Sequence, residues 1–318
     1  KLVDKHNEAL KIMPAIFSNN GYDVTVCNPN YANYQWIPDL SIYDDLEGVE
    51  AYNTGNSYID VEAKENIIKN NRRNFFMYSI MKSAPIITQN FLYNCGEYYG
   101  PKNGQTINGF TASGVDYEFL NAYSVLTSLP SLTSISSNQT GNVLIMTNDT
   151  THNDSQVLQE PDYVPVNYVD NKEHYKNLDR FTLNGRTLNI NNLMHIATYQ
   201  SDMAAFIQIG NWLDYLREID VYDNTKIILV SDHGAGLNQI NELILEENGA
   251  NTNDMECFTP LLMVKDFNSS DEFCVSDEFM TNADVPTIAF EDIIKNPINP
   301  YTNKNINNAE KYAHKQYI

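Results

Sequence analysis

The stretch that decides the fold is Tyr222–Ala235, which reads YDNTKIILVSDHGA. It begins with a polar turn, continues as an apolar run over Lys226–Val230, and ends at Asp232-His233-Gly234. An apolar run of this length between turn residues predicts a strand that is covered on both faces, which is typical of parallel sheets in α/β proteins. Because functional groups in such sheets gather beyond the carboxyl ends of the strands, Asp232 and His233 are candidate ligands.

The segments around this stretch complete an α/β pattern. The amphipathic run Leu193–Ile219 predicts the helix before the strand, and Lys5–Asn19, Gly21 and Tyr22–Cys27 predict a helix, a left-handed turn and a strand. The sequence therefore indicates helices on both faces of a largely parallel sheet. Further elements are predicted as a helix at Glu118–Leu129 and as strands at Asn142–Thr147 and Pro260–Val264.

A second strand exit carries ligand chemistry. The strand predicted at 142–147 is followed by a polar turn that holds Asp149 and His152. An Asp oxygen beside a His nitrogen suits Zn²⁺ or Mn²⁺ better than Ca²⁺. The spacing alone leaves an alternative open, in which Asp232 caps a following helix and His233 is an ordinary surface residue. For His152 taken by itself, a loop histidine without a binding role is the favoured interpretation.

Composition bounds the class of protein. The chain has 318 residues, with Lys+Arg 20 against Asp+Glu 41 and a formal charge of −21. This charge repels phosphate backbones and anionic bilayers, which argues against nucleic-acid binding and unassisted membrane docking. No window approaches the ~20 apolar residues that a membrane helix needs. Since the chain starts at Lys1 without Met or a signal peptide, we expect a processed protein or a piece of a longer one.

The cysteines indicate no metal site. Cys27, Cys95, Cys257 and Cys274 have neither a CxxC arrangement nor another zinc-ligand spacing. A disulfide between Cys257 and Cys274 and a set of free thiols both remain open.

Several segments, in this order, resemble the sulfatase-like branch of the alkaline phosphatase superfamily. Leu10–Cys27 resembles the helix and strand that follow the nucleophile in that family, and Met146–His152 resembles the strand that ends in a substrate-binding histidine. Tyr222–Ala235 resembles the C-terminal metal motif, and Asn282–Thr287 resembles a late D-x-P-T element. The resemblance spans nearly the whole chain, and it is to extracellular, membrane-anchored enzymes similar to lipoteichoic acid synthases and phosphoethanolamine transferases.

The resemblance implies a role for each candidate residue. Asp232 and His233 would be ligands of one divalent metal, Mn²⁺, Zn²⁺ or Mg²⁺, and His152 with Asp149 would contact the phosphate or sulfate of the substrate. The acidic ligand and the Thr, Ser or modified Cys nucleophile of the family are expected upstream of Lys1. Residues 235–259 contain neither His nor Lys, which favours the one-metal arrangement over a two-metal site.

Thr111 and Ser113 are possible substitutes for the nucleophile. They lie in the sequence GFTASG at 109–114, after the helix and strand that should follow the nucleophile. Because this is the wrong topological place, we interpret both as turn residues.

The resemblance also implies an architecture and an activity. Residues 1–318 would form one alkaline-phosphatase-like domain, a three-layer α/β/α sandwich with a mostly parallel central sheet that lacks its N-terminal strand and nucleophile segment. Residues 29–109, with a helix-like run at 61–92, would be an elaborated connection or helical insertion.

The activity implied for the full-length protein is that of a bacterial phospho- or sulfo-ester transferase or hydrolase. Upstream membrane helices would anchor it at the extracellular face, and its substrate would be an anionic envelope lipid, polymer or ester. This chain alone would be inactive. The alternative is a non-catalytic domain that binds an envelope polymer or a partner protein.

Overall fold

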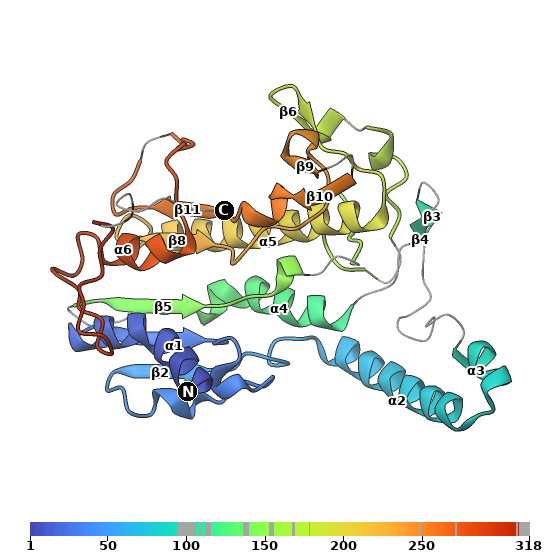
Figure 1. Ribbon diagram of the computed structural model, residues 1–318, viewed down its shortest axis with the longest axis horizontal. Helices are drawn as coiled ribbons and strands as arrows, with labels where there is room; N and C mark the ends of the chain where they lie inside the picture. The colour runs from blue at the N-terminus through green and yellow to red at the C-terminus, as the bar shows by residue number, and fades with distance from the viewer. Residues whose placement is uncertain are drawn as a thin grey trace.

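The N-terminal segment forms helix α1 (Leu2–Asn19) and strand β1 (Asp23–Cys27), as the sequence predicts. Gly21 joins them with a φ of +86°, a left-handed conformation that glycine adopts without a Cβ clash. The computed structural model (Figure 1) describes residues 1–93, 106–107, 110–111, 116–135, 140–152, 156–166, 169–177, 179–247, 250–270, 272–309 and 311.

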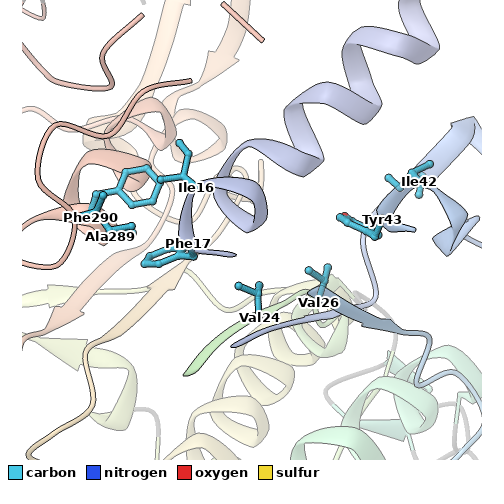
Figure 2. Packing of buried hydrophobic residues seen from close by; sticks show 10 residues of the cluster. Ile16, Phe17, Val24, Val26, Ile42, Tyr43, Ala289 and Phe290 are labelled. Atoms are coloured by element: carbon cyan, nitrogen blue, oxygen red, sulfur yellow. The ribbon is translucent and has the colours of Figure 1, made fainter. Parts of the chain in front are cut away.

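A parallel sheet lies next to α1. Strands β2 (Val49–Tyr52) and β5 (Asn142–Met146) flank β1 in the order β2-β1-β5, and both run parallel to it. Val24 lies opposite Val143 in the register, and since side chains alternate along a strand, both face the side covered by α1. Figure 2 shows the resulting core, in which Phe17 of α1 lies beside Phe290.

A second pair of strands carries the stretch that decides the fold. Strand β8 (Ile227–Val230) pairs antiparallel with β11 (Leu262–Lys265), so that Val230 lies opposite Leu262. Ile228 packs against the same core cluster as the parallel sheet. The α/β class is confirmed, although the parallel sheet contains three strands among the described residues and β8 is not hydrogen-bonded to it.

Two long helices form the rest of the core. Helix α4 (Tyr117–Leu132) packs along α5 (Leu193–Glu218), and both reach the sheet through Met146. Asn192 caps α5 by accepting a hydrogen bond from the His195 backbone N–H, as expected for an N-cap side chain. The short helix α6 (Val285–Phe290) contributes Phe290 to the α1 side of the sheet.

Helices α2 (Val61–Ser83) and α3 (Ile86–Tyr93) project from this core (Figure 1). The sequence predicts one helical run at 61–92, but the structure divides it at Pro85, which has no N–H to donate and disfavours a helical conformation at the residue before it. Among the described residues, no helix has the length and apolar character to cross a bilayer. The remaining strands form two-stranded antiparallel ribbons: β3 (Thr106–Ile107) with β4 (Phe110–Thr111), β6 (Thr182–Leu183) with β7 (Arg186–Thr187), and β9 (Ile244–Glu247) with β10 (Ala250–Asp254).

Candidate functional site

The exit of β8 presents Asp232 and His233 to solvent. Their side chains are 84% and 67% exposed, and Asp232 Oδ2 lies 3.6 Å from His233 Nε2. His233 Nδ1 lies 2.7 Å from the Gly234 carbonyl oxygen. Because a carbonyl oxygen only accepts, this contact calls for a proton on Nδ1, and Nε2 is the ring nitrogen that faces the carboxylate. The two residues therefore offer one oxygen and one nitrogen donor on the same side of the loop.

The backbone after β8 is held in this position by close packing. A Cβ on Gly234 would lie 1.9 Å from the Glu256 carbonyl oxygen, so no other residue fits without a shift of the backbone. The Gly234 N–H donates to the Cys257 carbonyl. The Glu256 carboxylate in turn accepts the backbone N–H groups of Gln239 and Ile240. Residues 234–240 form no helix, so the interpretation of Asp232 as a helix cap is wrong.

The late D-x-P-T segment contacts the same loop. Asn282, in the 3₁₀ turn Asn282–Asp284, donates its amide to the Asp232 carbonyl oxygen at 2.8 Å. Burial of the Asp284 carboxyl opposes its charge, but hydrogen bonds from Thr281 and the Lys311 ammonium at 3.2 Å hold the pKa below its usual range. Two segments that are fifty residues apart in sequence thus meet behind the candidate ligands.

The turn that follows β5 is held by hydrogen bonds of its own side chains. Asn148 donates its amide to the Ala122 carbonyl of α4 at 2.9 Å, and its side-chain oxygen accepts both the N–H and the hydroxyl of buried Thr150. Asp149 and His152 lie exposed on the outer side of this turn. The scaffold is therefore fixed, and the two predicted substrate-binding side chains reach solvent from it.

The structure pairs the predicted residues within each exit but not between the exits. Across the described chain, no hydrogen bond or ion pair joins Asp149 or His152 to Asp232 or His233. No group of three His, Cys, Asp or Glu residues in the described segments is arranged to hold a metal ion. Asp232 and His233 are thus a two-donor arrangement.

The carboxyl ends of the parallel strands are tied together by Asn28, which sequence reasoning missed. Its side chain accepts the Thr54 N–H at 2.8 Å and donates to the Thr54 hydroxyl and to the Thr147 carbonyl. Its φ of +55° is one that Asn tolerates better than most residues. The available signal was its place directly after a predicted strand.

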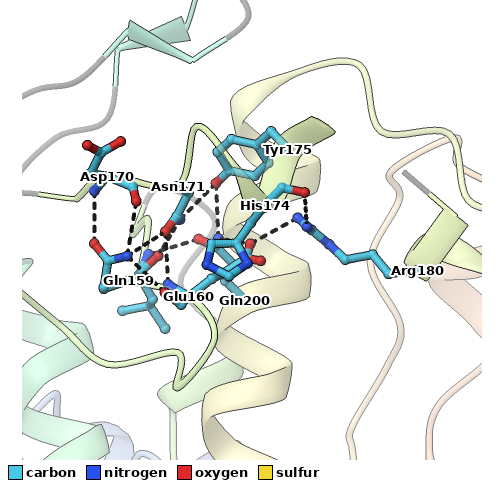
Figure 3. A network of polar contacts seen from close by, with 9 residues as sticks. Gln159, Glu160, Asp170, Asn171, His174, Tyr175, Arg180 and Gln200 are labelled. Carbon is cyan, nitrogen blue, oxygen red and sulfur yellow. Dashed lines mark hydrogen bonds and ion pairs between the residues drawn. The ribbon is translucent and has the colours of Figure 1, made fainter. Parts of the chain in front are cut away.

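A buried polar network was also missed (Figure 3). The Glu160 carboxylate, 2% exposed, accepts from Gln200 Nε2 at 2.7 Å and from Arg180 Nη2 at 3.1 Å. The Asn171 and Gln200 side chains also bond the backbone of Leu158, whereas the buried Arg180 Nε has no hydrogen-bond partner among the described residues. The described part of the polar segment 153–184 is fastened to α5 through the contacts of Gln200.

Two sets of candidates remain, the residues of the GFTASG segment and the four cysteines. Thr111 pairs with Thr106 in a short ribbon, so it is not a turn residue, and Ser113 lies outside the described residues. Cys27, Cys257 and Cys274 are free thiols, and Cys95 lies outside the described residues.

No family model, no curated protein and no solved structure matches the chain.

Proposed function

We propose that this chain is the larger part of a metal-dependent phospho- or sulfo-ester transferase or hydrolase of the sulfatase-like kind, with Asp232 and His233 as ligands of one divalent metal. The single observation that carries the proposal is the 3.6 Å separation between Asp232 Oδ2 and His233 Nε2. Two ligand atoms at ordinary metal distances, about 2.0–2.2 Å, and at a tetrahedral angle are about 3.4 Å apart. The donor pair therefore fits one ion without rearrangement.

The tautomer of His233 supports the same role. A metal-binding imidazole commonly donates its second N–H to a backbone carbonyl or a carboxylate, which orients the ring. His233 Nδ1 has this partner in the Gly234 carbonyl oxygen, and Asn282 fixes the neighbouring Asp232 carbonyl. The His233 ring is thus oriented by the loop that carries it, and the backbone of Asp232 is held by the turn at Asn282.

The sheet edges support the expected upstream strand. Among the described strands, β5 pairs only with β1 and β8 pairs only with β11. Both nevertheless face one core, since Val143, Ile145 and Ile228 pack against the same cluster. A strand inserted next to β5 and β8 would pair with edges that are open in the described residues, and its carboxyl end would bring a further acidic ligand toward Asp232.

In the proposed reaction, a divalent metal supplies positive charge that lowers the pKa of the nucleophile and offsets charge on the transferring group. His152 donates a hydrogen bond to a phosphoryl or sulfuryl oxygen from the rigid turn after β5. Asp232 and His233 hold the positive charge in place, and the Gly234 loop keeps them fixed. The nucleophile upstream of Lys1, the phospho- or sulfo-ester substrate of the envelope and the extracellular, membrane-anchored location stay predictions.

The experiment is an activity assay of the full-length protein with Mn²⁺, Mg²⁺ or Zn²⁺ on phosphodiester and sulfate-ester model substrates. We expect turnover that Asp232→Ala abolishes while the fold, checked by circular dichroism, is preserved. Glu173→Gln, which changes an equally exposed carboxylate away from the strand exits, should leave turnover unchanged.

The absence of turnover with every metal and ester, in a correctly folded protein, would instead favour the non-catalytic domain. The observation behind that alternative is that the described residues supply two donors and no third. In that case the same surface would bind an envelope polymer or partner protein without reacting.

A further inference from the structure

The projecting hairpin α2–α3 has a charge pattern opposite to that of the whole chain. Residues 66–93 contain four basic residues and no Asp or Glu, although 41 of the 318 residues are acidic. The basic side chains are exposed, and they are Lys69, Arg72, Arg73 and Lys82. The hairpin is therefore the place where an acidic molecule presents positive charge.

The end of the hairpin is apolar and free of charge. Residues 83–93 contain no Asp, Glu, Lys or Arg, and Ile87 and Phe91 of α3 are 92% and 84% exposed. Helix α3 has no buried residue, and Phe75 and Phe76 of α2 are also exposed. Apolar patches of this kind on a protein surface mark an interaction site.

Three hydroxyl groups at this end are bonded within the hairpin. The Ser79 hydroxyl donates to the Phe75 carbonyl, Ser83 to the Ser79 carbonyl, and Thr88 to the Pro85 carbonyl. A shallow open depression beside them is lined by Phe76, Ile80 and Ala84 together with the two serines. Groups that are already bonded lose little when they leave water, so this surface can enter an apolar medium.

We propose that the α2–α3 hairpin docks the protein on an anionic membrane surface, with α3 in the interfacial region and the basic residues of α2 at the headgroups. Exposed Ile and Phe side chains can insert into the interface of a bilayer, and the flanking Lys and Arg residues are attracted to anionic headgroups. A two-fold contact between copies would place the four cations of residues 66–93 near the same four of the other copy, which disfavours a second copy as the occupant. The proposal is independent of the metal site, because the hairpin contributes no candidate ligand.

The test is flotation of this chain with vesicles of phosphatidylcholine, with and without one third phosphatidylglycerol. We expect binding to the anionic vesicles, weakened about tenfold by Ile87→Ser with Phe91→Ser, since two large apolar side chains leave the interface. The matched control is Phe273→Ser with Val275→Ser, which changes residues of similar exposure, 78% and 81%, elsewhere on the surface and should leave binding unchanged.

Charge is tested by a second pair of variants. Arg72→Gln with Arg73→Gln should lower anionic-vesicle binding about fivefold for each charge removed, whereas Lys172→Gln with Lys176→Gln should not change it. The fluorescence of Ile87→Trp should be quenched by brominated lipids beyond the level of the native Trp residues. Failure of the wild type to float, or equal loss in the control variants, would overturn the proposal. Self-association without lipid that Ile87→Ser with Phe91→Ser removes would overturn it in favour of a second copy.

Discussion

The network around Glu160 and the exit of β8 use similar residue types in opposite ways. Glu160 is buried, and its carboxylate is enclosed by donors from Gln200 and Arg180. Asp232 is exposed, and its Oδ2 faces the Nε2 atom of His233. The first arrangement encloses its polar atoms within the fold, whereas the second leaves Asp232 Oδ2 and His233 Nε2 at the surface. A carboxylate near a basic side chain in a polar loop is thus a functional candidate only when its donor atoms are left open.

The largest expected effect comes from breaking the buried pair. Arg180→Met would leave the Glu160 carboxylate buried without its cation, and we expect the free energy of unfolding to fall by about 3–5 kcal/mol. Urea denaturation measures the change. Lys176→Met removes a lysine from an exposed pair with Glu173 and should have no measurable effect. Equal, small changes in both variants would show that the buried pair stabilises the fold no more than the exposed pair does.

Asp202 on α5 is a second carboxylate that sharpens the comparison. Its side chain is desolvated by burial without the hydrogen-bond donors that surround the Glu160 carboxylate. Burial raises the pKa of Asp202 from its ordinary value of 3.8 to about 6. A raised carboxyl pKa favours the folded state below the unfolded pKa, and this contribution is lost as pH rises toward 6. We expect Asp202→Asn to match the wild type near pH 4 and to be about 3 kcal/mol more stable at pH 7. Thermal unfolding across this pH range tests the sign, and a constant difference at all pH values would contradict it.

The backbone at the β8 exit makes the next prediction. Gly234→Ala would force a Cβ against the Glu256 carbonyl, and we expect a loss of about 1–3 kcal/mol in the free energy of unfolding. Gly210→Ala is the matched control, since a Cβ there meets nothing within 4 Å and the helix α5 should gain about 0.5–1 kcal/mol. If both variants were equally stable, the close approach behind Asp232 would be excluded.

Local pattern was enough to predict the elements that carry the candidate ligands. The periodicity of Leu193–Glu218 and the apolar run at Ile227–Val230 predict α5 and β8, because these signals depend on residues that are close in sequence. The left-handed turn at Gly21 follows from the same kind of signal.

Contacts between distant residues could not be predicted in this way. The partners of Glu160 lie twenty and forty residues away, and nothing local marks Gln200 as one of them. The same limit applies to Asn28, whose partner Thr147 is 119 residues distant. At the candidate site, the sequence identified Asp232 and His233, but the tautomer of His233 and the Asn282 contact required the fold.

The central claim is that Asp232 and His233 together hold a divalent metal, and NMR of this chain with Mn²⁺ tests it most directly. A paramagnetic ion bound by both residues should broaden the His233 imidazole and Asn282 side-chain amide signals, in the wild type and in Glu173→Gln alike. In Asp232→Asn this broadening should be lost with the fold unchanged, because the exposed side chain contributes little to stability. Broadening that persists in Asp232→Asn, or that is absent in the wild type, would contradict the account.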